Sequence, residues 1–199
     1  MNQKTTDQEI NVLGFAGSLR KGSYNRAALR VTKKLAPEGM NIEIFELDNI
    51  PLYNGDVEAR GFPASVQLFK DKIQAADALL IVTPEYNYSI SGVLKNAIDW
   101  ASRPPTQTPL IGKPVAIMGA TVGGFGTVRA QLVLRQILFS VKCLVLVHPE
   151  VYISRAQQKF DEEGNLIDEE TAVQIKNLLV ALYEWALLFK ISKARRTAA

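Results

Sequence analysis

A short segment rich in glycine and hydroxyl groups has the clearest potential for chemistry in this 199-residue chain: residues 17–25, with the sequence GSLRKGSYN. It follows the apolar run 12–16 and precedes a helical pattern, which predicts a strand, a loop and a helix N-terminus in succession. The first N–H groups of a helix have no partner inside it and the helix dipole is positive there, so such a junction binds anions, phosphate in particular. The candidate phosphate ligands are the hydrogen-bond donors Ser18, Ser23 and Asn25 and the permanently charged Arg20.

The motifs for larger phosphate groups are missing from this segment. A dinucleotide-binding loop carries Gly-x-Gly-x-x-Gly and a nucleoside triphosphate loop ends in Gly-Lys-Ser/Thr, and neither pattern occurs here. A terminal monophosphate, with about two negative charges, suits hydroxyl groups and one arginine at a helix N-terminus. The alternative is an ordinary serine N-cap after a first strand, and the segment by itself favours neither interpretation.

The elements that must position this loop alternate regularly along the chain. Apolar runs at 11–16, 41–46, 78–83, 114–120 and 142–147 predict strands, and the patterns at 24–36, 63–76, 91–102, 124–139 and 169–190 predict helices. The runs lack polar alternation, which is typical of parallel strands covered on both faces. We therefore expect an α/β fold: a three-layer, doubly wound, parallel sheet of five strands. We assign it the order 2-1-3-4-5, in which the loops after the first, third and fourth strands would converge at the topological switch point. Residues 48–61 are predicted to form a surface loop, and 150–167 a hairpin that turns at 163–165.

Composition indicates one globular domain over residues 1–199, with flexible ends at 1–9 and 192–199; the chain is 47% hydrophobic and 22% charged. No apolar run reaches the length of a membrane span and residues 1–9 lack the apolar core of a signal peptide, so we expect a cytoplasmic protein without membrane association.

A net charge of +3 without a dense basic cluster argues against nucleic-acid binding. Cys143, the single cysteine, lies in an apolar run, which favours a buried thiol over a reactive one.

Two further loops should meet the first one, because ligands of doubly wound sheets lie beyond the carboxyl ends of the strands. Loop 83–91 contains Pro84, Tyr86 and Tyr88, which offer flat apolar surface, and its backbone amides near Glu85 together with Asn87 could bind the polar edge of a planar heterocycle. Loop 119–126, which contains four glycines, offers little side-chain bulk, as would suit a ring lying close to the backbone. Separately, each loop could merely cover the core or form a turn. Together, the three loops describe a site for flavin mononucleotide (FMN).

Several of these segments resemble the NADPH-dependent FMN reductase family, and within it the bacterial quinone and chromate reductase branch. The resemblance covers about residues 10–190. The matching motifs are Gly17-Ser18-Leu19-Arg20-x-x-Ser23-x-Asn25, Pro84-Glu85-Tyr86-Asn87-x-Ser89, Leu94-Lys95-Asn96-Ala97-Ile98-Asp99-Trp100 and Arg129-Ala130-Gln131. One departure is Ser91, where many members have proline; serine could cap the helix that begins there.

The resemblance implies a flavodoxin-like fold, bound FMN, a homodimer or homotetramer, and electron transfer from NADPH or NADH to a small acceptor such as a quinone, chromate, an azo dye or free flavin. Carried over by position, Ser18, Arg20, Ser23 and Asn25 hold the phosphate. The isoalloxazine is lined by Pro84, Glu85, Tyr86 and Asn87, with Tyr88 and Ser91 nearby and Gly119, Gly123 and Gly124 beneath it.

The flavin would supply the chemistry, so we expect no catalytic side chain and no metal ligand. Two alternatives stay open: an electron-carrier flavoprotein, and a redox-responsive FMN-binding module without turnover. Carriers are typically acidic, whereas this chain has 23 basic and 20 acidic residues, which favours an enzyme.

Overall fold

Parallel strands form the centre of the fold. The computed structural model describes residues 9–197, and in this part of the chain the sheet has the order β2-β1-β3-β4-β5, with a sixth strand, β6, that also pairs with β4. Every strand pair is parallel. The strands are β1 (Ile10–Ala16), β2 (Met40–Phe45), β3 (Ala78–Val82), β4 (Pro114–Ala120), β5 (Leu144–Val145) and β6 (Val151–Ile153). The predicted strand order is confirmed.

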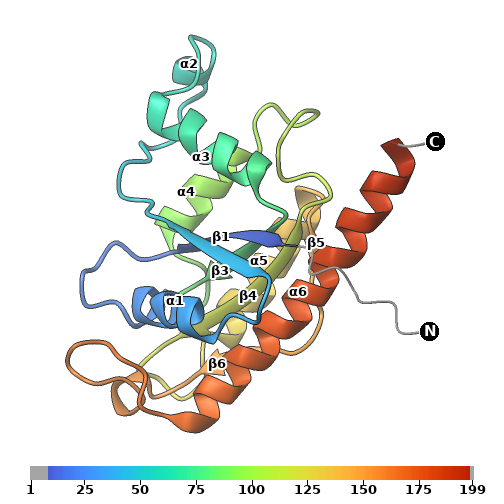
Figure 1. Ribbon diagram of the computed structural model, residues 1–199. Helices are drawn as coiled ribbons and strands as arrows, with labels where there is room; N and C mark the ends of the chain where they lie inside the picture. Colours follow the sequence, from blue (N-terminus) through green and yellow to red (C-terminus); the bar gives the residue numbers. More distant parts are fainter. Residues whose placement is uncertain (1–8, 198–199) are drawn as a thin grey trace, which may run out of the picture.

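Helices cover both faces of this sheet (Figure 1). On one face, α1 (Tyr24–Leu35) and α6 (Glu169–Thr197) share a core cluster with side chains of the strands. On the other face, α3 (Ala64–Ala75), α4 (Gly92–Ala101) and α5 (Val128–Ser140) form a second cluster. Successive residues of β3 point alternately into the two clusters, and Leu79, Leu80 and Ile81 are at most 1% exposed. This confirms the predicted three-layer arrangement, because a strand covered on both faces has no place for polar alternation.

The last predicted strand, 142–147, is shorter than expected. β5 pairs with Pro114 and Val115 at the beginning of β4, and β6 pairs with the end of β4 from Met118 to Ala120. Between the two strands, the guanidinium of Arg135 donates hydrogen bonds to the carbonyls of Leu146 and Val147, at 3.0 and 3.4 Å. Pro149, in the same segment, has no N–H to donate to a neighbouring strand. The fifth position of the sheet is therefore occupied by two short segments instead of one continuous strand.

The segment after β2 forms an ordered arm. Residues 48–61, predicted as a surface loop, include the short helix α2 (Gly55–Glu58), which lies at the outer end of the molecule in Figure 1. Two side chains of α4 hold the base of the arm. Asn96 accepts a bond from the Tyr53 N–H and donates to the Pro51 carbonyl, and the Trp100 indole N–H donates to the same carbonyl, each at 2.8 Å. The matching motif in residues 94–100 thus has a structural role.

The segment 150–167 is a hairpin only in its second half. Its first part contains β6 and a single turn of 3₁₀-helix, η1 (Ala156–Gln158). The predicted turn at 163–165 is closed by an antiparallel bridge between Phe160 and Leu166. Phe160 also packs on Tyr24 of α1, with ring centroids 5.7 Å apart, so the hairpin lies beside the loop that precedes α1.

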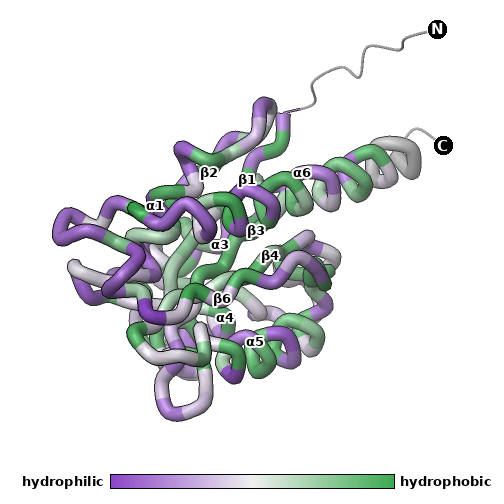
Figure 2. Tube along the Cα trace, turned by 90° about the horizontal axis from the view of Figure 1, so that it is seen from below, coloured by the Kyte–Doolittle hydropathy of each residue, from purple (hydrophilic) through white to green (hydrophobic). Residues whose placement is uncertain are grey.

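The length and composition of helix α6 depart from the expectation that no segment is long and apolar enough to span a membrane. Residues 169–192 are long and apolar enough for one, by length and composition alone. The side chains of Ile175, Leu178, Leu179 and Leu182 are buried in the core cluster, and Figure 2 shows hydrophilic residues interspersed along the helix. This pattern favours the core helix of an α/β fold, and the absence of membrane association stays a prediction. The predicted flexible ends lie largely outside the described residues, although α6 continues to Thr197.

Stability should depend on the inward face of α6. Leu182→Ala removes a fully buried side chain, and we expect it to lower the free energy of unfolding by about 2–5 kcal/mol. Leu188→Ala on the same helix is the matched control, because Leu188 is 62% exposed and should cost well under about 1 kcal/mol. Chemical denaturation of both variants measures the difference. Equal losses would contradict the assigned packing face.

Candidate functional site

Three loops meet at the carboxyl edge of the sheet: 17–23 after β1, 83–91 after β3 and 121–127 after β4. Backbone hydrogen bonds fix their beginnings to one another. The Gly17 N–H donates to the Val82 carbonyl at 2.8 Å, and the Thr83 N–H donates to the Met118 carbonyl at 2.9 Å. The site therefore begins where β1, β3 and β4 end together, as the predicted topology requires.

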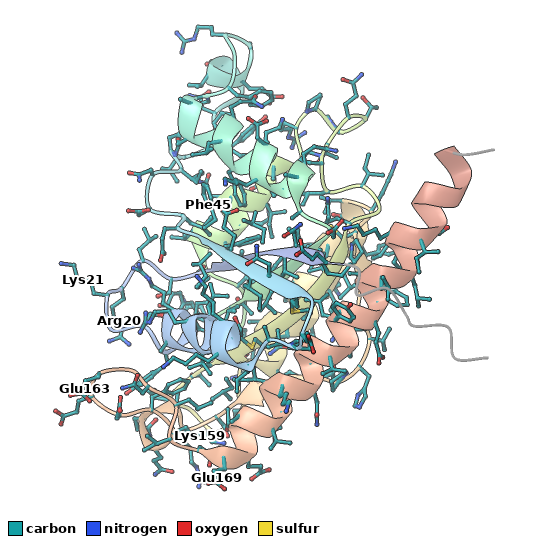
Figure 3. The ribbon with its side chains drawn as sticks, in the orientation of Figure 1. Arg20, Lys21, Phe45, Lys159, Glu163 and Glu169 are labelled. Atoms are coloured by element: carbon teal, nitrogen blue, oxygen red, sulfur yellow. The ribbon has the colours of Figure 1, made fainter. Side chains whose placement is uncertain are left out.

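The first loop leads directly into the N-terminus of α1. Ser23 is the N-cap of α1, and its hydroxyl accepts a bond from the Arg26 N–H at 3.4 Å. Ser18 is buried, whereas Arg20 and Lys21 are exposed, and Figure 3 shows both at the outer edge of the loop. Among the residues that the structure describes, no hydrogen bond or ion pair engages the Arg20 guanidinium. The loop thus presents an uncommitted cation next to a helix N-terminus.

Asn25 has a structural role that the sequence did not indicate. Its side-chain amide donates to the Ala120 carbonyl and accepts from the Ala120 N–H, both at 2.8 Å, and the residue is only 4% exposed. The two bonds satisfy the backbone of the last residue of β4 from the first turn of α1. Asn25 therefore ties the first loop to the third.

Ser91 connects the first loop to the second. It is the N-cap of α4, where its hydroxyl accepts from the Leu94 N–H at 3.2 Å and donates to the Gly17 carbonyl at 2.6 Å. A Cβ on Gly17 would lie only 3.0 Å from Leu94 Cβ and from the Ser91 hydroxyl, so the close approach of α4 requires glycine there. The expectation that serine caps this helix in place of proline is confirmed.

The second loop presents its aromatic residues to the outside. Tyr86 and Ser89 exchange two backbone hydrogen bonds of 2.9 Å, and the two residues between them, Asn87 and Tyr88, have left-handed φ angles of 49° and 67°. This tight turn exposes 53% of Tyr86 and 71% of Tyr88, while Pro84 is buried beneath it. The tyrosines do not cover the core, which was their alternative interpretation.

Glu85 connects the second loop to α5. One carboxylate oxygen accepts from the backbone N–H groups of Arg129 and Ala130, at 3.1 and 3.2 Å, and the other pairs with the Arg129 guanidinium at 2.5 Å. A carboxylate at a helix N-terminus satisfies free N–H groups and opposes the positive end of the dipole. Gln131, next along the motif, is fully buried and donates to the Val151 carbonyl at 2.9 Å. The first turn of α5 thus joins the second loop to β6.

A cleft opens between the second and third loops, with a volume of about 340 Å³. Arg129 lies at its side, with its guanidinium carbon 4.0 Å from the ring centre of Tyr88 and 4.8 Å from that of Phe125. The lining residues are Glu85, Asn87, Tyr88, Thr121, Gly123, Phe125, Thr127 and Arg129. The sequence interpretation missed the contributions of Thr121, Phe125 and Thr127. For Arg129 the motif was visible, but its contact with the aromatic residues was not.

The three glycines of the third loop differ in role. Gly119 is buried within β4, where a Cβ would collide with Thr127 and with the Thr83 carbonyl. Gly123 and Gly124 are exposed, and Gly123 lines the cleft. Because Gly119 has no side chain, the segments of Thr83 and Thr127 can approach it closely. Gly123 lines the cleft without filling it with a side chain.

Other chemically active groups lie away from this edge. Burial raises the pKa of the Cys143 thiol to about 12, so the thiolate is not available near neutral pH and the expected buried cysteine is confirmed. Within residues 9–197, no group of three or more His, Cys, Asp or Glu side chains is arranged to hold a metal ion. That the protein works without a metal stays a prediction.

The residues present at this edge fit FMN. The first loop offers hydroxyl groups, helix N–H groups and the free Arg20 for a terminal phosphate. The cleft has the size range of ligand pockets, and its lining combines two aromatic rings and a glycine with five polar or charged residues. Together with the strand order, this combination defines a flavoprotein of the flavodoxin-like class.

Comparison with known proteins identifies the family. The chain belongs to the NADPH-dependent FMN reductase family, whose model matches residues 10–158, and it is an FMN-dependent NAD(P)H oxidoreductase. It is 56% identical over 177 residues to an NAD(P)H-dependent FMN reductase of Pseudomonas aeruginosa, covering 89% of this chain and 95% of the relative. A quinone reductase of Escherichia coli K12 is 43% identical over 187 residues, covering 92% of this chain and 99% of the relative.

A solved structure agrees with these relatives. The flavoenzyme FerB of Paracoccus denitrificans, an NAD(P)H:acceptor oxidoreductase, superimposes with a TM-score of 0.81 at 37% identity, covering 89% of this chain and 97% of that chain. The predicted family, fold and cofactors are therefore confirmed.

The Glu85 contact should be a main source of local stability. We expect Glu85→Gln to lower the free energy of unfolding by about 2 kcal/mol, because the carboxylate is 9% exposed and serves two N–H groups and a guanidinium. Glu46→Gln is the control, since Glu46 is 49% exposed in its pair with Arg26 and should cost less than about 1 kcal/mol. Denaturant titration compares them, and a loss as small as that of the control would show that Glu85 does not anchor α5.

Proposed function

We propose that this protein transfers electrons from NAD(P)H, through bound FMN, to quinones. The observation that carries the proposal is the meeting of a phosphate-type loop with an open, aromatic-rimmed cleft at one edge of the sheet. The names of the relatives support the acceptor class, since they include a quinone reductase and a 2-hydroxy-1,4-benzoquinone reductase. Chromate, azo dyes and free flavin are further acceptors that an open cleft would admit.

The proposed cofactor residues divide into ligands and supports. Ser18, Ser23, the N–H groups of α1 and Arg20 hold the phosphate. The turn formed by Tyr86, Asn87 and Tyr88, the backbone after Pro84 and the floor at Gly123 and Gly124 surround the ring. The supporting residues fix the positions of these loops through the contacts described above; they are Asn25, Glu85, Ser91 and Gly119.

When bound, FMN supplies the redox chemistry, accepting a hydride equivalent from NAD(P)H and passing electrons to the acceptor. The protein's own contribution is to bind, to orient and to limit access. The exposed tyrosines offer a surface on which planar substrates can stack. None of these roles requires a catalytic side chain.

The sequence by itself left an electron carrier and a regulatory module open as alternatives to an enzyme. The membership of the chain in a reductase family favours turnover, and the open cleft favours small molecules over a protein partner. Steady-state oxidation of NAD(P)H with benzoquinone tests this directly. Sustained turnover supports the proposal, whereas rapid reduction of the protein by NAD(P)H without passage of electrons to benzoquinone contradicts the assigned acceptor.

We also propose that the protein works as a homodimer or homotetramer in the cytoplasm, where NAD(P)H is available. Three large apolar side chains near α5 support self-association: Leu132 is 53%, Phe139 82% and Val147 77% exposed. Phe139→Asp should shift the sedimentation profile toward smaller species, while Leu68→Asp on α3, at 52% exposure, serves as the control. An unchanged profile for Phe139→Asp would place the interface elsewhere.

Arg20→Ala should weaken FMN binding more than it weakens catalysis. The guanidinium is exposed and makes no internal contact in the described part of the chain, so its loss should leave the fold intact while lowering FMN affinity about tenfold or more. Titration of apoprotein with FMN gives the affinity, and assays at saturating FMN give the turnover. If added FMN fails to restore activity to a folded variant, the assignment of Arg20 to the phosphate is wrong.

A further inference from the structure

Arg155 is a charged group at the site edge that the proposed FMN contacts do not use. It follows β6 and precedes η1, with a left-handed φ of 49°. Its N–H donates to the Gly123 carbonyl at 3.1 Å, and the next N–H, from Ala156, donates to the Thr121 carbonyl at 3.0 Å. Both acceptors line the cleft. The backbone at Arg155 and Ala156 is thus held by two hydrogen bonds to residues that line the cleft.

The side chain of Arg155 is exposed and uncommitted. Within residues 9–197, its guanidinium forms no hydrogen bond and no ion pair. The other arginines near the cleft have partners or another assignment, since Arg129 is paired with Glu85 and Arg20 belongs to the phosphate loop of α1. A planar, permanently charged donor group on a rigid backbone is the usual recognition element for a phosphate.

Arg103 is a further arginine to consider, and it lies at the opposite edge of the sheet. Arg103 follows the C-terminus of α4, and a crossover helix between parallel strands runs back toward their amino ends. Its guanidinium lies near Tyr53, on the arm after β2, at 5.4 Å from the ring centre. Arg103 is therefore turned toward the arm and is not at the rim of the cleft.

We propose that Arg155 binds the 2′-phosphate of NADPH and so favours NADPH over NADH. The inference rests on the proposed function, because it assumes that the nicotinamide nucleotide enters the cleft beside Asn87, Tyr88 and Gly123. NADPH and NADH differ by this one phosphate on the adenosine ribose, and a nearby arginine is the group that accommodates it. The backbone at Arg155 is bonded to two residues that line the cleft, and its exposed guanidinium has no other partner in the described residues, so it is available to a phosphate of the nucleotide.

The test compares Arg155→Gln and Arg155→Lys in the FMN-loaded protein, with benzoquinone as acceptor. We expect Arg155→Gln to lower kcat/KM for NADPH about tenfold and to change the value for NADH less than about twofold. Arg155→Lys should retain part of the preference, since it keeps the charge but not the planar donor set. Lys176→Gln, which removes one exposed positive charge from α6, is the matched control and should leave both values unchanged.

A binding experiment separates this proposal from the proposed function. Calorimetry with 2′,5′-ADP should show about tenfold weaker binding to Arg155→Gln than to the wild type, and 5′-AMP should bind both equally, whether or not the protein turns over. Equal losses for NADPH and NADH, or unchanged 2′,5′-ADP binding, would overturn the proposal. Loss of FMN from Arg155→Gln would also overturn it, because Arg155 would then serve the flavin phosphate. A wild type that binds 2′,5′-ADP through Arg155 but reduces no quinone would contradict the proposed function alone.

Discussion

The site depends on one constraint: where three loops leave a parallel sheet and lead into helices, the unpaired backbone groups must be satisfied by side chains of neighbouring segments. Strand ends leave N–H and C=O groups without a ladder partner, and a buried unpaired group costs about 1–3 kcal/mol. Asn25 satisfies both groups of Ala120, and Ser91 satisfies Gly17. Glu85 does the same for the first turn of α5. These buried contacts hold the loops at fixed separations around the cleft.

The buried contacts leave the outward-facing groups free for ligands. Tyr86, Tyr88 and Phe125 are each more than half exposed, and the Arg20 and Arg155 guanidinium groups have no partner in the described part of the chain. A protein that exposes aromatic rings and unpaired cations at one edge gives up stability there, and a ligand with a planar ring and phosphate groups recovers it. The buried residues therefore fix the site, and the exposed residues remain available to contact a ligand.

Much of this arrangement could be predicted from the sequence, and the exceptions have physical reasons. Continuous apolar runs such as 78–82 identify parallel strands because both faces are buried, and their alternation with helices identifies a doubly wound sheet. The break between β5 and β6 was missed because it depends on Arg135, a residue of α5. Its guanidinium donates hydrogen bonds to the carbonyls of Leu146 and Val147 in the segment between the two strands. The sequence predicted Asn25 as a phosphate ligand because its side chain can donate hydrogen bonds. Its bond to Ala120, 95 positions away, could not be predicted from the residues around it. Ser91 was interpreted correctly because capping is local.

The most direct test of the central claim is the visible absorption spectrum of the purified protein, repeated without oxygen after NADPH is added. Bound FMN at the edge formed by the three loops predicts a flavin spectrum that NADPH bleaches rapidly and that quinone then restores. A colourless protein that added FMN cannot reconstitute would contradict the account. A flavin spectrum that NADPH leaves unchanged would show that the cleft does not admit the nucleotide.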